Sequence, residues 1–397
     1  MNKSPLFLNV CGMVNALGGD KQTVLTNLIS GNTDGVIPWD NKIQGKTVYV
    51  GQVQTVLPEV PEQFKQFDCR NNQLMLSALE QIQIEVDQLK STYALNRIAV
   101  VLGTSTSGIL EGENALQVKV NSGKFPANFD YRQQEIGTPA IFLRKYLGLK
   151  GLAFTVSTAC SSSAKVFASA SRLINSDLCD AAIIGGVDSL CRLTVNGFSS
   201  LESVSAGRCN PVSVNRDGIN IGEAAALFIL SREDSSIKLL GVGESSDAHH
   251  MSAPHPEGRG AKAAMRAALA NAGLDASGIS YINMHGTATR LNDAMESLAI
   301  EDIFGSETPV SSTKPLVGHT LGAAGATEVG FCWLLLNQSE PATGLPPHIW
   351  DEIRDEILPV INLVKQGAQL KISSGTALLS NSFAFGGNNA SVIIARY

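Results

Sequence analysis

The sequence has 397 residues, of which 44% are hydrophobic and 17% charged, and its formal net charge is −6. This length exceeds what one hydrophobic core usually serves, so two lobes are predicted, and the composition excludes a disordered chain. The negative charge argues against a general nucleic-acid binder, although a local basic patch could still bind an acidic protein.

The N-terminal stretch MNKSPLFLNVCGMVNALGGD shares only part of the pattern of a secretory signal peptide. Lys3 precedes apolar residues, but Asn9 and Asn15 interrupt the run and no A-x-A cleavage site follows. We therefore predict a first β-strand followed by a loop. No window approaches the ~20 uninterrupted apolar residues of a membrane-spanning helix, so no membrane insertion is expected.

Short runs rich in β-forming residues alternate with helical patterns along the whole chain, which predicts α/β architecture. The predicted strands are mostly continuous apolar runs, as in a sheet covered on both faces, and lie at 96–103, 151–158, 180–189, 225–231, 237–246, 279–286, 378–385 and 391–397. The predicted helices lie at 71–86, 161–174, 260–272, 292–303 and 321–336. The polar segment SREDSS at 231–236 is the expected seam between an N-terminal half, 1–232, and a C-terminal half, 233–397.

The cysteine pattern bears on the redox environment of the protein. Seven cysteines are present, which is an odd number, and no two of them have CxxC spacing. The pattern indicates neither a disulfide framework nor a zinc knuckle. We therefore expect reduced thiols and a cytoplasmic protein.

One cysteine stands in an unusual setting, the stretch VSTACSSSAK at 156–165, where a predicted strand gives way to a predicted helix. Small residues around Cys160 permit close backbone approach, and a helix starting there would aim free N–H groups at the sulfur. Such a setting lowers the pKa of a thiol and offers donors to an oxyanion. The alternative is an inert buried cysteine, which is what most free cysteines are, and this stretch alone leaves both interpretations open.

Two histidines lie in polar, glycine-bearing loops directly after predicted strands. His285 occurs in NMHGTATRLNDAMES, and His319 occurs in SSTKPLVGHTLGAAGATE. Loops at the C-terminal ends of strands are where open α/β sheets usually place ligands. Either histidine alone is consistent with a residue that fixes its loop, but together with Cys160 they favour a catalytic group.

The segment HHMSAPH contains three further histidines, His249, His250 and His255. No nearby cysteine or carboxylate pair completes a familiar ligand spacing, and Pro254 and Pro256 favour an irregular loop. We therefore expect no metal site.

Four separated motifs resemble those of one enzyme family: VSTACSSSAK, HGTATRLNDAME, STKPLVGHTLGAAGATE and NSFAFGGNNA. The family is the β-ketoacyl-acyl-carrier-protein synthases, which are Cys-His-His condensing enzymes of the thiolase fold. NPVSVNRDGINIGEAAAL and SSDAHHMSAPHP are similar to further segments of the family, so the likeness covers nearly the whole chain. It implies a five-layer αβαβα sandwich of two pseudo-twofold-related halves, which accounts for the weak echo between VSTACSSSAK and NSFAFGGNNA.

The resemblance implies a decarboxylative Claisen condensation by an acyltransferase, a 3-oxoacyl-[acyl-carrier-protein] synthase of fatty acid or polyketide biosynthesis. Cys160 would accept an acyl chain, and His285 and His319 would hydrogen-bond the malonyl thioester carbonyl as carbon dioxide leaves. Two donors are needed because negative charge develops on one oxygen, where each preorganised donor is worth a factor of about 10²–10³. The backbone N–H groups of Cys160 and Phe385 would bind the oxyanion of the cysteine steps.

Other positions of the motifs carry supporting roles by the same resemblance. Lys314 and Glu328 match a pair that orders the histidine loop, although a plain ion pair is the alternative. Thr287 and Thr289 match positions that contact the phosphopantetheine arm of the carrier. We expect no resident cofactor, because that arm arrives with the substrate.

A gate is also implied at the second half's FAFGG motif. Phe385 matches the gate that moves when the cysteine is acylated, with Gly386 and Gly387 as its hinge. Phe198 falls where the acyl pocket is lined, although an aromatic residue in an apolar run is equally consistent with ordinary core.

The motifs depart from the usual family pattern at several positions. HGTGTPLGD reads HGTATRLND, which places Arg290 and Asn292 beside the pantetheine channel, and FGFGGTN reads FAFGGNN, which places Ala384 and Asn388 in the gate loop. The segment 104–113, TSTSGILEGE, lacks a glycine pair common in long-chain elongation enzymes. These departures favour a specialised synthase of a type II polyketide or aryl polyene pathway.

The resemblance also implies partners. Acyl carrier proteins are acidic, and four basic residues are candidates for docking them, each of which could equally be a solvated surface charge: Lys65, Arg70, Arg208 and Arg290. Family members are dimers, so we expect a homodimer or a heterodimer with a paralogue resembling a chain-length factor.

Three alternative functions are weighed against this one. A biosynthetic thiolase would carry a second catalytic cysteine near the C-terminus, and no cysteine follows Cys332. A chain-length factor is a non-catalytic subunit that lacks the nucleophile, whereas Cys160 is present. A cysteine hydrolase would need a base paired to the thiol and access for water.

Overall fold

The computed structural model describes residues 4–39 and 47–397 of the chain. Its strands are β1 (Leu6–Val14), β2 (Val36–Pro38), β3 (Tyr49–Gly51), β4 (Ile98–Gly103), β5 (Ala153–Val156), β6 (Ala181–Asp188), β7 (Ile221–Gly222), β8 (Ala224–Ser231), β9 (Ile237–Ser246), β10 (Ile279–Asn283), β11 (Pro309–Ser311), β12 (Ala342–Gly344), β13 (Asn362–Leu363), β14 (Gln369–Lys371), β15 (Ala377–Phe383) and β16 (Asn388–Arg396). Its α-helices are α1 (Lys21–Ser30), α2 (Arg70–Glu80), α3 (Gln83–Thr92), α4 (Ile109–Ser122), α5 (Thr138–Tyr146), α6 (Ser162–Asn175), α7 (Arg192–Ser200), α8 (Arg259–Ala272), α9 (Arg290–Phe304), α10 (Lys314–Val317) and α11 (Ala324–Leu336). None of the helices within these described ranges combines the length and apolar character that spanning a bilayer requires.

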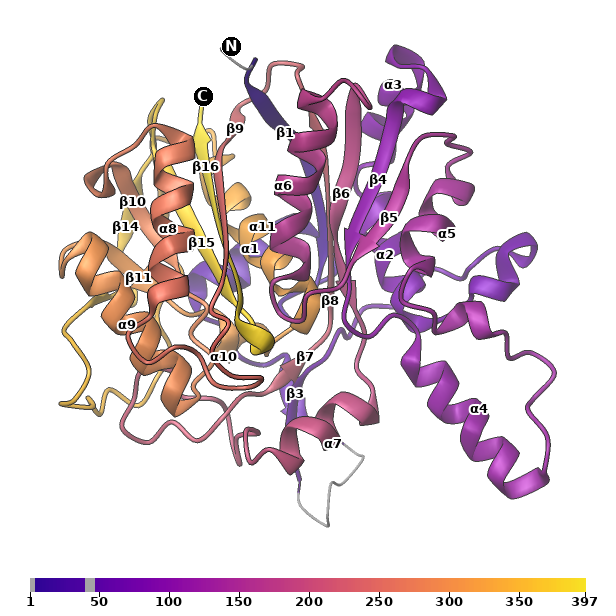
Figure 1. The fold of residues 1–397 in the computed structure, drawn as a ribbon, viewed down its shortest axis with the longest axis horizontal. Coiled ribbons are helices and arrows are strands. Elements are labelled where there is room, and N and C mark those ends of the chain that lie inside the picture. The colour runs from indigo at the N-terminus through magenta and orange to yellow at the C-terminus, as the bar shows by residue number, and fades with distance from the viewer. Residues whose placement is uncertain (1–3, 40–46) are drawn as a thin grey trace.

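The two halves of the chain repeat one strand arrangement (Figure 1). In the first half, β4 is parallel to β5 and β6, and β6, β8 and β1 follow as antiparallel neighbours. In the second half, β10 is parallel to β11 and β15, and β15, β16 and β9 follow in the same antiparallel manner. A short antiparallel pairing of β1 with β9 joins the two sheets into one of 11 strands. The repeated order is the internal symmetry that the echo between sequence motifs predicted.

Helices form three layers around these two sheets (Figure 1). α2 and α5 cover the outer face of the first sheet, α8 and α9 lie outside the second, and α6 and α11 pack together between them. Three hydrophobic clusters fill the four interfaces between the five layers, and the middle cluster draws side chains from both sheets. Every residue of α11 is buried, because this helix has a sheet on each side. The predicted αβαβα sandwich is confirmed.

The start of α6 lies unusually close to the first sheet. A Cβ atom added to Gly103 would come 2.4 Å from the Ser163 backbone nitrogen, and one added to Gly186 would come 2.4 Å from the Ser163 Cβ atom. Glycine at these strand ends therefore lets the helix begin directly on the C-terminal edge of β4 and β6. This approach places the VSTACSSSAK turn at the edge where parallel strands end.

Most of the predicted elements are confirmed, including the first strand, but several boundaries are wrong; the strand predicted at 391–397, for example, begins at Asn388. The helix predicted at 71–86 breaks between α2 and α3, because the Gln81 side-chain amide donates to the Met13 and Gly19 carbonyls of another segment. The strand predicted at 279–286 ends at Asn283, and the helix predicted at 321–336 begins as a 3₁₀ turn before α11. Residues 232–236 connect β8 to β9, while the division at 232/233 stays a prediction.

Candidate active site

Cys160 lies in a sharp turn between β5 and α6. Ala159 before it has a φ of 53°, in the left-handed region, and the Thr158 N–H donates to the Ser162 hydroxyl at 2.8 Å. The Ser162 hydroxyl donates in turn to the Ala159 carbonyl at 2.6 Å. These local bonds hold the backbone in a conformation that an L-residue rarely adopts, which is common at functional turns.

The environment of the Cys160 sulfur disfavours the thiolate in the structure described. Burial raises the pKa of Cys160 to about 11, although the Lys314 ammonium and the backbone N–H groups of Phe385 and Cys160 act in the opposite direction. The expected lowering of the thiol pKa by the helix start is therefore wrong for this state, because desolvation outweighs the helix. The effect of the two N–H groups on the thiol shows that both lie near the sulfur, while their role in binding an oxyanion stays a prediction.

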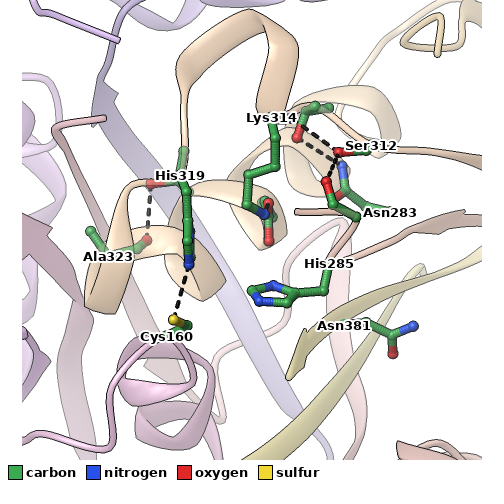
Figure 2. A network of polar contacts seen from close by, with 12 residues as sticks. Cys160, Asn283, His285, Ser312, Lys314, His319, Ala323 and Asn381 are labelled. Atoms are coloured by element: carbon green, nitrogen blue, oxygen red, sulfur yellow. Dashed lines mark hydrogen bonds and ion pairs between the residues drawn. The ribbon is translucent and has the colours of Figure 1, made fainter. Parts of the chain in front are cut away.

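His319 lies above the thiol (Figure 2), with its Nε2 atom 2.9 Å from the Cys160 Sγ atom. It follows α10, and its backbone joins β7: the His319 N–H donates to the Asn220 carbonyl at 2.6 Å, and the Gly222 N–H donates to the His319 carbonyl at 2.8 Å. The position of the imidazole is thus set by the backbone of a neighbouring strand.

His285 lies beside His319, with ring centroids 5.1 Å apart and the rings nearly perpendicular (Figure 2). The His285 and Gly286 N–H groups donate to the two carboxylate oxygens of Glu296, each at 2.7 Å. These two bonds to the Glu296 carboxylate hold the chain after the end of β10 at Asn283, and they direct it toward the site. Glu296 is a positioning residue that sequence reasoning missed, although the polar run HGTATRLNDAME contains it.

Both histidines are held neutral. Burial and the Lys314 ammonium lower the pKa of His285 and of His319 well below the ordinary value. A neutral imidazole donates through one ring nitrogen only. The Nδ1 atoms of both rings have no hydrogen-bond partner among the described residues, and the Nε2 atom of His319 is the one in contact with the thiol.

Lys314 and Glu328 form a buried ion pair next to the histidines. The Lys314 side chain extends from α10 toward the space between the two imidazoles (Figure 2). Burial raises the pKa of Glu328, and the Lys314 ammonium opposes that shift. The pair places a positive charge by the site, which adds to the larger effect of burial in lowering the pKa of both histidines.

A pocket leads from the surface to the thiol. An outer chamber of about 350 Å³ is lined by Arg290, Phe385 and other residues, and it adjoins an inner space of about 20 Å³ that contacts Cys160, His285 and His319. Thr287 and Thr289 line the inner space, and their hydroxyl groups are 3.0 Å apart. The passage is therefore almost closed at the nucleophile.

Phe385 lines both chambers. Its ring lies 5.5 Å from the Phe198 ring, and both residues line the inner space. Gly386 and Gly387 follow with φ values of 81° and 74°, a left-handed region that favours glycine. The structure thus places the predicted gate, hinge and pocket residues together, while their roles stay predictions.

The four candidate docking residues differ in their surroundings. Arg208 and Arg290 are exposed, and Arg290 lines the outer chamber. The Lys65 side chain is 54% exposed, although its ammonium pairs with Asp68 at 2.7 Å. The Arg70 guanidinium turns inward to the buried carboxylate of Glu223, and its role in docking stays a prediction.

Possible metal ligands gather at one place in the described ranges. The donor atoms of Cys160, His285 and His319 lie within 4.8 Å of one another, and these residue types suit zinc. Binding of zinc there would require the Cys160 thiol to lose its proton, which its raised pKa opposes.

The HHMSAPH segment lies in a loop that one of its histidines stabilises. The His250 Nδ1 atom accepts the backbone N–H groups of Ser252 and Ala253, each at 3.1 Å, so this ring fixes its loop.

Comparisons with known proteins agree with this geometry. The family model described as beta-ketoacyl synthase, N-terminal domain, matches residues 38–236, and the C-terminal domain model matches residues 237–345. A chain of the solved complex between the ketosynthase ApeO and its chain length factor ApeC from Xenorhabdus doucetiae is 47% identical. That match covers 99% of this chain and 98% of the other, with a TM-score of 0.94.

Curated relatives are more distant. 3-Oxoacyl-[acyl-carrier-protein] synthase 2 of Rhizobium meliloti is 36% identical over 278 residues, which is 63% of this chain and 62% of that protein. The chloroplastic 3-oxoacyl-[acyl-carrier-protein] synthase II of Arabidopsis thaliana is 27% identical over 97% of this chain and 74% of its own length. The match to the Rhizobium protein thus spans less than two thirds of that relative.

Proposed function

Because the chain belongs to the beta-ketoacyl synthase family, we propose that it condenses a Cys160-bound acyl chain with a malonyl group on an acyl carrier protein. One observation carries the proposal: a thiol and two neutral imidazoles converge in a buried pocket, with the thiol also facing two backbone N–H donors. This arrangement supplies one nucleophile and two separate places for negative charge on oxygen.

In the first step, the Cys160 sulfur attacks the carbonyl carbon of an acyl thioester. The thiol proton passes to the leaving pantetheine sulfur, and the Nε2–H group of His319, 2.9 Å from Sγ, stabilises the thiolate character of the attacking sulfur. The oxyanion of the tetrahedral intermediate accepts hydrogen bonds from the Cys160 and Phe385 N–H groups. An acyl-cysteine and a free carrier thiol result.

In the second step, the bond between the malonyl carboxylate and its α-carbon breaks and carbon dioxide leaves. The electron pair moves onto the thioester as an enolate, whose oxygen accepts hydrogen bonds from His285 and His319. Neutral imidazoles suit this task because they donate without protonating the enolate outright.

In the third step, the enolate carbon attacks the acyl-cysteine carbonyl, a carbon–carbon bond forms and the cysteine sulfur leaves. One proton from solvent restores the thiol, and the carrier holds a β-ketoacyl chain two carbons longer. No resident cofactor is proposed, because the phosphopantetheine arm belongs to the carrier.

We further propose a specialised pathway of the aryl polyene or type II polyketide kind and a partner subunit. The 47% identity to a chain of a ketosynthase–chain length factor complex supports both. β5 is the outermost strand of its sheet among the described residues, and Phe154 in it and Leu152 just before it are 37% and 46% exposed, so an apolar edge is available to a second chain.

Two rival functions fit less well. A chain-length-factor role would leave Cys160, His285 and His319 without a use, although the structure brings them together. A thiolase role would place a second cysteine where Phe385 and the glycines stand. The seven cysteines, all unpaired among the described residues, support a cytoplasmic setting.

The test supplies the purified chain with an acyl-carrier primer and then with malonyl-carrier, and follows both by intact-protein mass spectrometry. We expect a covalent adduct on Cys160, absent from Cys160→Ala, and then a β-keto product two carbons longer. An adduct without extension that is rescued by a chain-length-factor paralogue supports the heterodimer. No adduct with any primer would overturn the proposed function.

A further inference from the structure

His319 depends on β7 for its position. Its backbone exchanges hydrogen bonds with Asn220 and Gly222, so a shift of β7 moves the imidazole as well. The approach is close: a Cβ atom added to Gly222 would lie 2.2 Å from the Val317 carbonyl oxygen, and one added to Gly51 would lie 1.8 Å from it. β3 and β7 thus clamp the loop that carries His319.

Glu223, the residue after β7, bonds this strand to parts of the chain that are distant in sequence. Its side chain is fully buried, and its carboxylate accepts the Val53 N–H at 3.0 Å and the Leu190 N–H at 3.2 Å. The Arg70 guanidinium donates to the same carboxylate through Nε at 2.8 Å and Nη2 at 2.5 Å. One carboxylate therefore joins the start of α2, the segment after β3 and the end of β7.

Two of the three guanidinium nitrogens of Arg70, Nε and Nη2, are engaged within the chain. Its side chain is 27% exposed, and its Nη2 atom also donates to the Val53 carbonyl at 3.3 Å. A two-pronged arginine–carboxylate pair has a defined geometry, and loss of one partner would leave the other charge buried and uncompensated. The pair is thus suited to fix the location of β7.

We propose that Arg70 and Glu223 are positioning residues for His319, acting through β7, and that Arg70 is not a docking residue for the carrier. The inference rests on the proposed condensing function, in which His319 stabilises the malonyl enolate. The ion pair fixes β7, β7 fixes the His319 backbone, and the imidazole then faces both the thiol and the substrate oxygen.

The test compares Arg70→Met with Arg97→Met. Arg97 forms a similar two-pronged pair with Asp180, at 3.0 and 2.7 Å, but at the opposite end of β4 and β6 from the site. The substrate is malonyl-pantetheine, which has no carrier protein, and release of carbon dioxide is measured. For Arg70→Met we expect kcat to fall 10- to 100-fold with KM changed less than threefold, while Arg97→Met stays within twofold of the parent. Arg70→Lys should recover part of kcat.

Two further readouts separate positioning from loss of fold and from failure of the proposed function. The double variant Arg70→Met/Glu223→Gln removes both charges while the amide oxygen still accepts one of the two buried N–H groups, so it should melt no lower than Arg70→Met alone while kcat remains low. The iodoacetamide alkylation rate of Cys160 needs no natural substrate, and it should change at least threefold in Arg70→Met but not in Arg97→Met.

The outcomes that overturn the inference are distinct. If Arg70→Met keeps the parent kcat on malonyl-pantetheine and loses activity only with malonyl-carrier, Arg70 is a docking residue. If Arg97→Met loses as much kcat, the effect is general destabilisation. If the parent itself releases no carbon dioxide, the proposed function fails, and an unchanged alkylation rate in Arg70→Met then overturns the positioning role as well.

Discussion

The Nε2 atom of His319 lies 2.9 Å from the Sγ atom of Cys160, and both groups are buried. Burial raises the pKa of the thiol and lowers the pKa of the imidazole, so the resting pair is a thiol and a neutral ring and not an ion pair. The Cys160 nucleophile must therefore be activated when substrate arrives and the oxyanion donors engage.

The protonation state of Cys160 can be measured directly. With a pKa of about 11, the thiolate makes up roughly one part in a thousand of the enzyme at pH 8. We expect the rate of Cys160 alkylation by iodoacetamide to rise about tenfold per pH unit between pH 7 and 9.5 without a plateau. A plateau below pH 8 would show a thiolate–imidazolium pair instead.

Replacement of His319 tests the division of labour between the two imidazoles. His319→Ala removes one of two donors to the enolate oxygen, so malonyl decarboxylation should fall by a factor on the order of 10²–10³. The same loss is expected in a Cys160→Gln background, where transfer to cysteine is impossible. Decarboxylation at the parent rate in both backgrounds would remove His319 from the mechanism.

Glu296 predicts a pH dependence of stability. Burial raises its pKa from 4.5 to about 7, against the opposing hydrogen bonds from Gly286 and His285. Because the folded state holds this proton more tightly than the unfolded chain, stability is fully present below about pH 4.5 and is lost as the pH rises through 7. The loss from this group amounts to roughly 2–4 kcal/mol.

Glu296→Gln should remove that slope. Urea unfolding at pH 5 and pH 8 measures the difference in unfolding free energy for the parent and the variant. The parent should lose more stability than the variant over this interval, even though the variant is less stable at both values because its amide group opposes one of two N–H donors. Equal slopes would mean that Glu296 is ionised in the folded protein throughout.

The α/β architecture and the grouping of Cys160, His285 and His319 could be predicted from the residues, whereas the five-layer sandwich and the role of each residue came from the resemblance of the motifs to a family. The three residues each stand in small, polar segments just after apolar strands, and such strand ends meet at one edge of the folded sheets. The ion pair of Arg70 could not be predicted, because its partner, Glu223, is 153 residues away. The pKa of Cys160 was misjudged because local helix geometry is visible in a motif, whereas burial by distant segments is not.

The gate hinge provides a test with a matched control. An alanine at Gly387 would put a Cβ atom 2.8 Å from the Asp247 Cβ atom, at a φ of 74°. Gly367 has a φ of 81° with open space around its Cβ position, so Gly367→Ala carries only the backbone strain of about 1–2 kcal/mol. Gly387→Ala should slow acylation of Cys160 at least tenfold, and Gly367→Ala should leave it unchanged. Similar rates for both variants would argue against Gly387 as a hinge.

The buried carboxylate of Asp188 accepts hydrogen bonds from two segments that reach the site. It accepts the hydroxyl groups of Thr104 and Thr106 at 2.5 and 2.8 Å, the N–H groups of Ser105 and Thr106, and the Ala323 N–H at 3.1 Å near His319. In Asp188→Asn, the amide group would face N–H donors and leave them unsatisfied, at a cost of roughly 2–4 kcal/mol in unfolding free energy. Thr106→Val removes only one hydroxyl donor and should cost about 1 kcal/mol. Urea unfolding of both variants decides the matter: if Asp188→Asn loses no more stability than Thr106→Val, the carboxylate does not hold the two segments together.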